Sequence, residues 1–435
     1  MRHIVRIKAL LLAALTLFTA LTCGAALAGC GAKDDSRPVL NVWVYSDEYA
    51  RQIEHAFEAD MSSASWRPEI TVVTAAELDE RIEQAAKKDE LPDVFMLSPD
   101  SLRKYVESDI TADLSELGLS YSPSTYYDYT IAVGTDSAGT LKAACWQPDP
   151  GLFFYRRSLA KAYLGTDSPD EVGEMLSTWD GFLTTARSIR ELSRGKTSMV
   201  VGTEDIMRAW LGSDQNGWES DGRMALSGTA ADFLDYAKTM ADEELIYDAQ
   251  QWSASWVAGM SDPQSVFGYF SSGLGMKDVL KKACGGSVAG YGSYADWACV
   301  RGPSAYNWGG CWFAVSSTSR MKKQASVFLE YFTCEKEAMQ RNFLIDGAFS
   351  ANRTVVETIK YDSQFGDPFL AGQNYYAVQA EVADEITMTR LTERTSFIDN
   401  AFSECVRAYV FDGQSRDDAL ADFAKRVQAV YPELF

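Results

Sequence analysis

Alternating strand and helix patterns in residues 38–106 constrain the fold of this chain most. The apolar runs VLNVWV, EITVV and DVFML alternate with the amphipathic stretches YARQIEHAFEADM, ELDERIEQAAKK and SLRKYVES. Such alternation is typical of βαβ units with parallel strands. Ligands bind such sheets at the carboxyl ends of the strands, which here carry Tyr45, Asp47 and Ser98. We therefore predict an α/β fold with a binding site at this edge.

The rest of the chain is long enough for a second lobe. A length of 435 residues exceeds what one hydrophobic core usually holds. Beyond Ser158 the apolar spacing is mostly helical, and residues 263–286 read as a helix, a small-residue turn and another helix. A strand is expected at 308–317, and two helices, at 396–411 and 415–431, close the chain.

The first 29 residues have the features of a secretory signal. A basic start is followed by an uncharged apolar run, which ends in Leu-Ala-Gly-Cys at residues 27–30. This ending resembles the bacterial lipobox, which implies that Cys30 carries a lipid and begins the mature chain. Residues 30–37 then form a polar tether, and the protein is exported and lipid-anchored on the outer face of the cytoplasmic membrane. An ordinary signal peptide or an N-terminal membrane helix is the alternative.

Charge and cysteine content narrow the partners and the redox state. The formal net charge of −21 repels phosphate backbones, so we expect no nucleic-acid partner. Six cysteines remain after the signal and Cys30. An exported chain can oxidise them, so we expect one or more disulfides, with buried free thiols as the alternative. These six are Cys145, Cys284, Cys299, Cys311, Cys334 and Cys405.

Histidine is nearly absent, which argues against most catalytic machinery. Only His3 and His55 occur, and His55 lies in a charged helical stretch. A Ser-His-Asp or Cys-His nucleophile and a His-rich zinc site are therefore not expected. We predict no enzymatic activity, catalytic residue, metal or cofactor. Paired carboxylates of a glycoside hydrolase remain an alternative, although nothing in the sequence places two of them across a cleft.

Tryptophan is abundant and often lies in turn-like contexts. Flat aromatic faces suit the C–H faces of sugar rings, and neighbouring carboxylates and amides suit their hydroxyls. Core packing is the alternative for any single tryptophan. The chain has 11 tryptophans, among them Trp146, Trp210, Trp252 and Trp308.

Five segments in order resemble one family. They are LPDVFMLSPDSLRKYVESDITADLSEL, GTLKAACWQPDPGLFFYRRSLAKAYLG, STWDGFLTTARSI, VFGYFSSGLGM and WGGCWFAVSSTSRMKKQASVFLEYFTCEKEAMQ. Together they are similar to extracellular solute-binding proteins of ABC importers, the carbohydrate-binding family 1 type. Asp109-Ile110, Gly181 and Leu274 depart from the family's usual glycine, glutamate and lysine.

The resemblance implies two α/β lobes, each a mainly parallel sheet flanked by helices, with a ligand cleft between them. Mapped onto this chain, the first lobe is 38–145 with 305–347, and the second is 148–302 with 350–435. Crossings fall near 145–150, 302–306 and 347–351. At the first crossing, Pro148 and Pro150 fix their own φ and favour extended geometry at Gln147 and Asp149.

The resemblance also implies a function and a set of contacts. We expect a monomer that captures a carbohydrate, in particular an oligosaccharide, and delivers it to ABC permease subunits by hinge closure. Alternatives are a non-sugar solute such as a polyamine, peptide or metal complex, and a signalling co-receptor. The candidate ligand contacts are Tyr45, Asp47, Ser98, Trp308, Gly309 and Gly310 in the first lobe, Trp146, Gln147 and Asp149 at the crossing, and Trp210, Trp252 and Arg353 in the second lobe.

Overall fold

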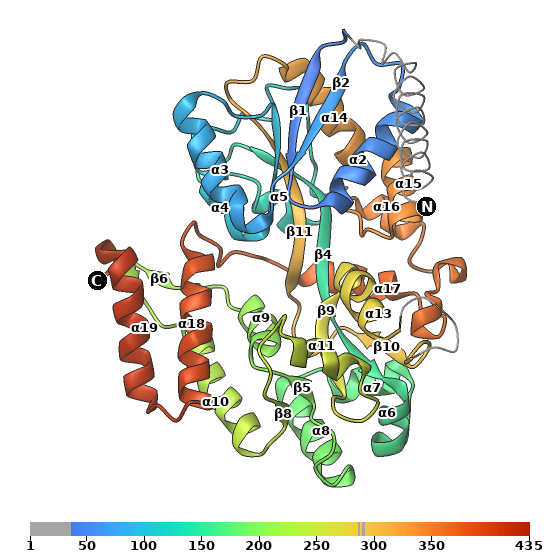
Figure 1. Ribbon diagram of the computed structural model, residues 1–435, viewed down its shortest axis with the longest axis vertical. Helices are drawn as coiled ribbons and strands as arrows, with labels where there is room; N and C mark the ends of the chain where they lie inside the picture. The colour runs from blue at the N-terminus through green and yellow to red at the C-terminus, as the bar shows by residue number, and fades with distance from the viewer. Residues whose placement is uncertain (1–35, 286–287, 289–291) are drawn as a thin grey trace, which may run out of the picture.

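A computed structural model describes residues 36–285, 288 and 292–435. The predicted signal peptide, Cys30 and all but the last two residues of the tether lie outside the described residues. Figure 1 shows two bodies, called here the upper and lower lobes, with two long strands running between them. This arrangement is the two-lobed α/β fold that the sequence predicts.

The upper lobe is built around three parallel strands. β1 (Val39–Val44) lies between β2 (Arg67–Val72) and β3 (Val94–Leu97) and pairs with both. The predicted βαβ arrangement is therefore confirmed. Helices cover the sheet: α2 (Asp47–Asp60), α3 (Ala75–Lys88), α4 (Pro99–Val106), α5 (Asp128–Ala132), α14 (Lys322–Thr333), α15 (Lys336–Asp346) and α16 (Arg353–Glu357).

Apolar side chains fill both faces of this sheet. Leu40, Val42 and Val44 alternate along β1 and pack with α2 and α14 on one face. Phe95 and Leu97 pack with α3 and α4 on the other face. Because helices cover both faces of the sheet, its strands are held in place. The loops at the strand ends therefore have fixed positions on the side that faces the lower lobe.

The strand β4 (Ala143–Arg156) crosses from one lobe to the other (Figure 1). Its first half pairs antiparallel with β11 (Asn307–Val315), which also pairs with β3. Its second half pairs antiparallel with β9 (Gly268–Ser272) and β10 (Trp297–Val300). One mixed sheet of seven strands therefore runs through both lobes, so the pairing in the lower lobe is more antiparallel than the sequence suggests.

Glycine is required where β4 meets the segment that leads into β11. A Cβ on Gly151 would lie 2.1 Å from the ring of Tyr306, whose carbonyl accepts the Gly151 N–H at 2.8 Å. The hydroxyl of Tyr306 donates to the carbonyls of Leu152 and Ser271, at 2.9 and 3.1 Å. Tyr306 thus ties β4 to β9 just below the crossing.

The lower lobe is mostly helical. Two short strand pairs, β5 (Val200–Val201) with β8 (Ile246–Tyr247) and β6 (Glu219–Ser220) with β7 (Arg223–Met224), lie among its helices. A π-helical turn spans Met276–Leu280. The helices are α6 (Arg157–Leu164), α7 (Pro169–Met175), α8 (Trp179–Leu192), α9 (Glu204–Gly212), α10 (Gly228–Asp242), α11 (Ala254–Ser261), α12 (Gly273–Gly275), α13 (Lys281–Ala283), α17 (Tyr375–Glu385), α18 (Thr395–Val410) and α19 (Arg416–Val430).

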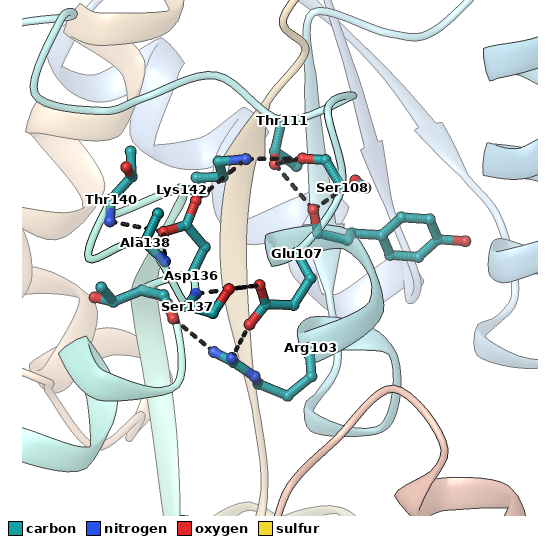
Figure 2. A network of polar contacts seen from close by, with 11 residues as sticks. Arg103, Glu107, Ser108, Thr111, Asp136, Ser137, Ala138, Thr140 and Lys142 are labelled. Atoms are coloured by element: carbon teal, nitrogen blue, oxygen red, sulfur yellow. Dashed lines mark hydrogen bonds and ion pairs between the residues drawn. The ribbon is translucent and has the colours of Figure 1, made fainter. Parts of the chain in front are cut away.

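A polar network fixes the turn that leads into β4 (Figure 2). Arg103 donates to the carbonyl of Thr135 at 2.6 Å, and Glu107 accepts the N–H of Ser137 at 3.1 Å. Asp136 accepts the N–H of Thr140 at 2.8 Å and lies 3.4 Å from Nζ of Lys142. Desolvation raises the pKa of Asp136, but these two partners outweigh it and hold the pKa below its ordinary value.

The cysteines do not follow the prediction of disulfides. All six cysteines of the described part are free, and all but Cys334 are buried. Cys145 and Cys311 belong to adjacent strands, and burial raises the pKa of each thiol. The expectation of a disulfide is wrong in this structure, and the alternative of buried thiols holds. Among the described helices, none combines the length and apolar character that a membrane crossing needs.

Candidate ligand-binding cleft

A cavity of about 360 Å³ lies between the lobes, where β4 and β11 cross. This volume lies in the range of small-molecule sites. The cavity is lined from both lobes and from the crossing strands. The lining residues are Tyr45, Ser46, Glu48, Tyr49, Gln52, Ser98, Pro99, Asp100, Gln147, Asp149, Arg208, Trp252, Leu274, Gly275, Lys277, Asp278, Trp308, Gly309 and Gly310.

The structure brings eight of the twelve candidate contacts together in this lining. They come from the end of β1, the loop before α4, the crossing strands and a loop of the lower lobe. Because parallel strands end at one edge, two of the three residues expected at the strand ends, Tyr45 and Ser98, line the same cavity. The eight are Tyr45, Ser98, Gln147, Asp149, Trp252, Trp308, Gly309 and Gly310.

Trp146 does not line the cavity. It is 3 % exposed and stacks on Phe313 with ring centroids 5.2 Å apart, inside the core beneath α2 and α14. The register between β4 and β11 shifts beside it, since Cys311 opposes Gln147 while Trp312 opposes Cys145. This bulge lets Trp146 pack in the core, so core packing, the alternative for a single tryptophan, applies here.

The other three candidates also lie elsewhere. Trp210 packs against Trp179 and Tyr236, and its Nε1 donates to the carbonyl of Thr229 at 2.8 Å. Asp47 is exposed in the first turn of α2, where its neighbours in sequence, and not its own side chain, reach the cavity. Trp210 therefore packs against other aromatic side chains of the lower lobe, and Asp47 faces solvent at the start of its helix.

Arg353 is held by the upper lobe, although we expected it in the lower one. Its N–H donates to the carbonyl of Thr125 at 2.7 Å, and its Nε donates to the carbonyl of Tyr126 at 3.0 Å. The guanidinium also pairs with Asp384 of α17 and lies 4.4 Å from the ring centroid of Tyr127. Arg353 therefore bridges the lobes outside the cavity lining.

The hinge side of the cavity depends on a close approach of β11 to β4. Gly310 has φ +100°, and a Cβ there would lie 2.4 Å from the carbonyl oxygen of Gln147. Only glycine fits this geometry without displacing backbone. The carbonyl of Gly310 accepts the hydroxyl of Tyr45 at 2.9 Å, which fixes that ring at the cavity edge.

Asp149 is a buried carboxyl at the cavity floor. Its side chain accepts the hydroxyl of Ser272 at 2.5 Å and the N–H of Leu274 at 3.5 Å. Burial raises the pKa of Asp149 to about 7; these two hydrogen bonds lower it in part, and the nearby Asp278 adds to the increase. No Lys or Arg of the described residues forms an ion pair with it. The group can therefore accept a hydrogen bond from a ligand without competition from a protein cation.

Two tryptophans supply flat surfaces from different parts of the cleft. The guanidinium of Arg208 lies 5.3 Å from the ring centroid of Trp308, and Arg208 donates to the Trp308 carbonyl at 2.9 Å. Trp252 is 60 % exposed with φ +67°, an uncommon conformation for a tryptophan. An exposed indole held in this way over a cavity is suited to stacking on a ligand.

Sequence reasoning missed most of the charged lining. Glu48 and Gln52 lie one turn apart on α2, so the helical period after Tyr45 could have indicated them. Arg208 and the segment of Leu274 to Asp278 come from the lower lobe, and only the folded chain places them opposite β1.

The cleft continues beyond the central cavity. A second cavity of about 180 Å³ shares Pro99, Asp100, Arg208 and Trp308 with the first. A third of about 710 Å³ shares Tyr45, Ser98 and Asp100 with the first and reaches α18 and the residue after α19. These shared residues join the three spaces into one groove between the lobes, which extends further than a single compact ligand requires.

Comparison with known families agrees with this arrangement. Residues 55–365 match the family model described as bacterial extracellular solute-binding protein. This chain belongs to that family. The predicted membership is therefore confirmed, and the family is one of extracellular proteins that bind solutes. No curated protein matches the sequence of this solute-binding protein.

Solved structures share the fold of this solute-binding protein at low sequence identity. An extracellular solute-binding protein of family 1 is 16 % identical, with a TM-score of 0.76, over 90 % of this chain and 99 % of that one. The sugar-binding protein MalE from Xanthomonas citri is 16 % identical, with a TM-score of 0.73, over 91 % and 98 %. The galacto-N-biose-/lacto-N-biose I-binding protein of Bifidobacterium longum is 14 % identical, with a TM-score of 0.72, over 92 % and 99 %.

Proposed function

We propose that this protein is a lipid-anchored receptor that captures a carbohydrate, in particular an oligosaccharide, and delivers it to the permease of an ABC importer. The observation that carries the proposal is the interlobe cavity, in which Trp252 and Trp308 lie near the buried acceptors Gln147 and Asp149. Indole faces stack on sugar rings, and buried acceptors bind sugar hydroxyls. The groove that extends from this cavity supports a ligand of more than one sugar unit.

Structural neighbours support a sugar as the ligand class. The Bifidobacterium longum protein was solved with lacto-N-biose, and a binding protein from B. animalis was solved with β-1,6-galactobiose. GacH of Streptomyces glaucescens was solved with acarbose. These ligands differ from one another, so the neighbours support the class of ligand and not its identity.

Hinge closure is the proposed means of capture. The lobes are joined by β4, by the segment around Tyr306 and by the chain between α16 and α17. The first two segments lie near the predicted crossings at 145–150 and 302–306, whereas the third comes after the predicted crossing at 347–351. Rotation about these segments would bring Trp252 of the lower lobe toward Tyr45 of the upper lobe. A closed form that buries the ligand would then be recognised by the permease.

A thermal-shift screen with mono- and oligosaccharides tests the ligand class. A ligand at 100 times its dissociation constant adds about 2.7 kcal/mol to the free energy of unfolding. We expect at least one sugar to raise the melting temperature, and the Trp308→Ala variant to lose most of that increase. If polyamines, peptides or metal complexes raise the melting temperature and no sugar does, the carbohydrate proposal is wrong.

The anchor is tested separately. In a bacterial host fed a radiolabelled fatty acid, the full chain should incorporate label and sediment with membranes. The Cys30→Ala variant should do neither, because the acceptor thiol is missing. Label on the Cys30→Ala variant would contradict the lipid-anchor proposal without affecting the proposed ligand.

A further inference from the structure

A chain of three side chains sets the orientation of an amide at the cavity floor. Nε2 of Gln147 donates to Oε1 of Gln52 at 2.7 Å, and Nε2 of Gln52 donates to Oε1 of Glu48 at 3.4 Å. Arg51 pairs with the other carboxylate oxygen of Glu48. Both glutamines are buried, and all three residues of this relay line the cavity.

The relay has one consistent direction. A carboxylate accepts hydrogen bonds and donates none, so Glu48 requires the NH₂ group of Gln52. Gln52 must then present its oxygen to Gln147, which in turn must present its NH₂ group to Gln52. Each amide is therefore oriented by the residue before it in the relay.

The free end of the relay is an acceptor. Oε1 of Gln147 has no hydrogen-bond partner among the residues that the structure describes, and Gln147 is 1 % exposed. An unpaired buried oxygen costs free energy unless a ligand supplies a donor. Asp149 lies two residues along β4 in the same lining and likewise presents carboxylate oxygens.

Each of the two cations of the lining donates to a backbone carbonyl. Nζ of Lys277 donates to the carbonyl of Asp346, and Arg208 donates to the carbonyl of Trp308. Four acidic side chains line the same cavity: Glu48, Asp100, Asp149 and Asp278. An anionic ligand group at the floor would thus meet the acceptor oxygen of Gln147 in a lining where four acidic side chains outnumber two cations.

We propose that Gln147, held as an acceptor by Glu48 and Gln52, determines specificity at the hinge end of the cleft. It selects a ligand group that donates hydrogen bonds, a hydroxyl or an amine, and rejects carboxylate- or phosphate-bearing sugars. This inference rests on the proposed function for the nature of the ligand, but the orientation of the relay can be tested without any ligand.

The first test measures thermal stability at pH 8. Gln147→Glu places a carboxylate against the Gln52 oxygen, and we expect the melting temperature to fall by about 3 °C. Adding Glu48→Gln lets the Gln52 amide turn around, so the double variant should recover most of that loss. Glu54→Gln, on the exposed side of α2, is the matched control and should recover none.

Equal losses in the single variant and in the Glu48→Gln double variant would overturn the relay. If Gln147→Glu does not fold, Gln147→Leu provides a second comparison. It removes the donor to Gln52 in either orientation, so Glu48→Gln should not rescue it. Rescue of Gln147→Leu would overturn the proposed direction of the relay.

The second test compares neutral sugars with acidic counterparts: glucose with glucuronate, galactose with galacturonate, and cellobiose with cellobiouronate. For each neutral sugar that raises the melting temperature, the acidic counterpart should give no increase. Glu48→Gln frees the Gln147 amide to turn and should improve the relative affinity for the acidic member by about tenfold. An acidic sugar that stabilises the unaltered protein as much as its neutral counterpart would overturn the specificity proposal.

The two tests fail in distinguishable ways. If no sugar of either kind binds, the proposed function is wrong, while the stability comparison still decides the orientation of Gln147. If neutral sugars bind, but Glu48→Gln neither rescues Gln147→Glu nor improves the relative affinity for acidic sugars, the proposed function stands and the specificity proposal is wrong.

Discussion

Replacing Asp149 by Asn should change how the stability of this protein depends on pH. The carboxyl is 3 % exposed, and burial raises its pKa to about 7. A carboxyl whose pKa is higher in the folded than in the unfolded protein binds its proton more tightly when folded, so ionisation costs stability. That cost is absent below about pH 4, grows as the pH rises toward 7 and is complete above about pH 7.

The magnitude follows from the two pKa values. The difference between about 7 in the folded protein and about 3.9 in an unfolded chain corresponds to about 4 kcal/mol at pH 8. An asparagine side chain at this position would keep a similar shape and an acceptor for the Ser272 hydroxyl, but it cannot ionise. The Asp149→Asn variant should therefore match the unaltered protein near pH 4 and exceed its stability by about this amount at pH 8.

Urea unfolding of both proteins between pH 4 and pH 8 measures this difference. Asp232→Asn, at an exposed position on α10, is the control and should leave the pH dependence unchanged. Other buried acids, such as Asp205, contribute equally to both proteins and cancel in the comparison. If the curves of the unaltered protein and Asp149→Asn run parallel across this range, Asp149 is not a carboxyl that burial keeps protonated, and the reasoning fails.

Four further outcomes are expected. Trp308→Ala should weaken binding of the best sugar by about tenfold or more in calorimetry, because it removes a stacking surface. Trp146→Ala should cost about 3–5 kcal/mol in urea unfolding and leave the affinity of the folded protein unchanged. Asp136→Asn should lower stability at pH 7 and by less as the pH falls toward 3: the pKa of Asp136 is lower in the folded than in the unfolded protein, so its contribution is present above the unfolded pKa and is lost as the pH falls through the folded pKa. Because the described cysteines are free, a reducing agent should not change the melting temperature.

The elements of the upper lobe could be predicted because each carries its own local signal. Along β1, every second residue is apolar and buried in the core. Ser46 begins α2 by accepting the N–H of Tyr49 at 3.3 Å. Thr178 begins α8 in the same way, by accepting the N–H of Gly181 at 3.0 Å. Local periodicity and capping chemistry do not depend on the rest of the chain.

The segment of β9 shows where local signals fail. Residues 263–286 were expected to be helix, turn and helix, but Gly268–Ser272 is a strand that pairs with β4. Every residue of β9 is buried, so its sequence does not alternate between apolar and polar. Spacing alone cannot separate such a strand from a buried helix, and only the partner strand decides.

The same distinction applies to the site. Trp146 and Trp308 both lie beside turn-forming residues, yet a bulge places one in the core while the other lines the cavity. The relay from Glu48 to Gln147 joins residues that are 99 positions apart in the chain, with Gln52 between them. No pattern within either segment specifies that contact.

The sequence by itself determined the βαβ order, the positions of most helices and the two strand ends that carry Tyr45 and Ser98, because these follow from residues within a few positions of each other. Only the tertiary structure decided which side chains share the cavity and that its floor at Gln147 and Asp149 presents acceptors. Burial and hydrogen-bond orientation depend on atoms from both lobes, and those atoms meet only when the chain is folded.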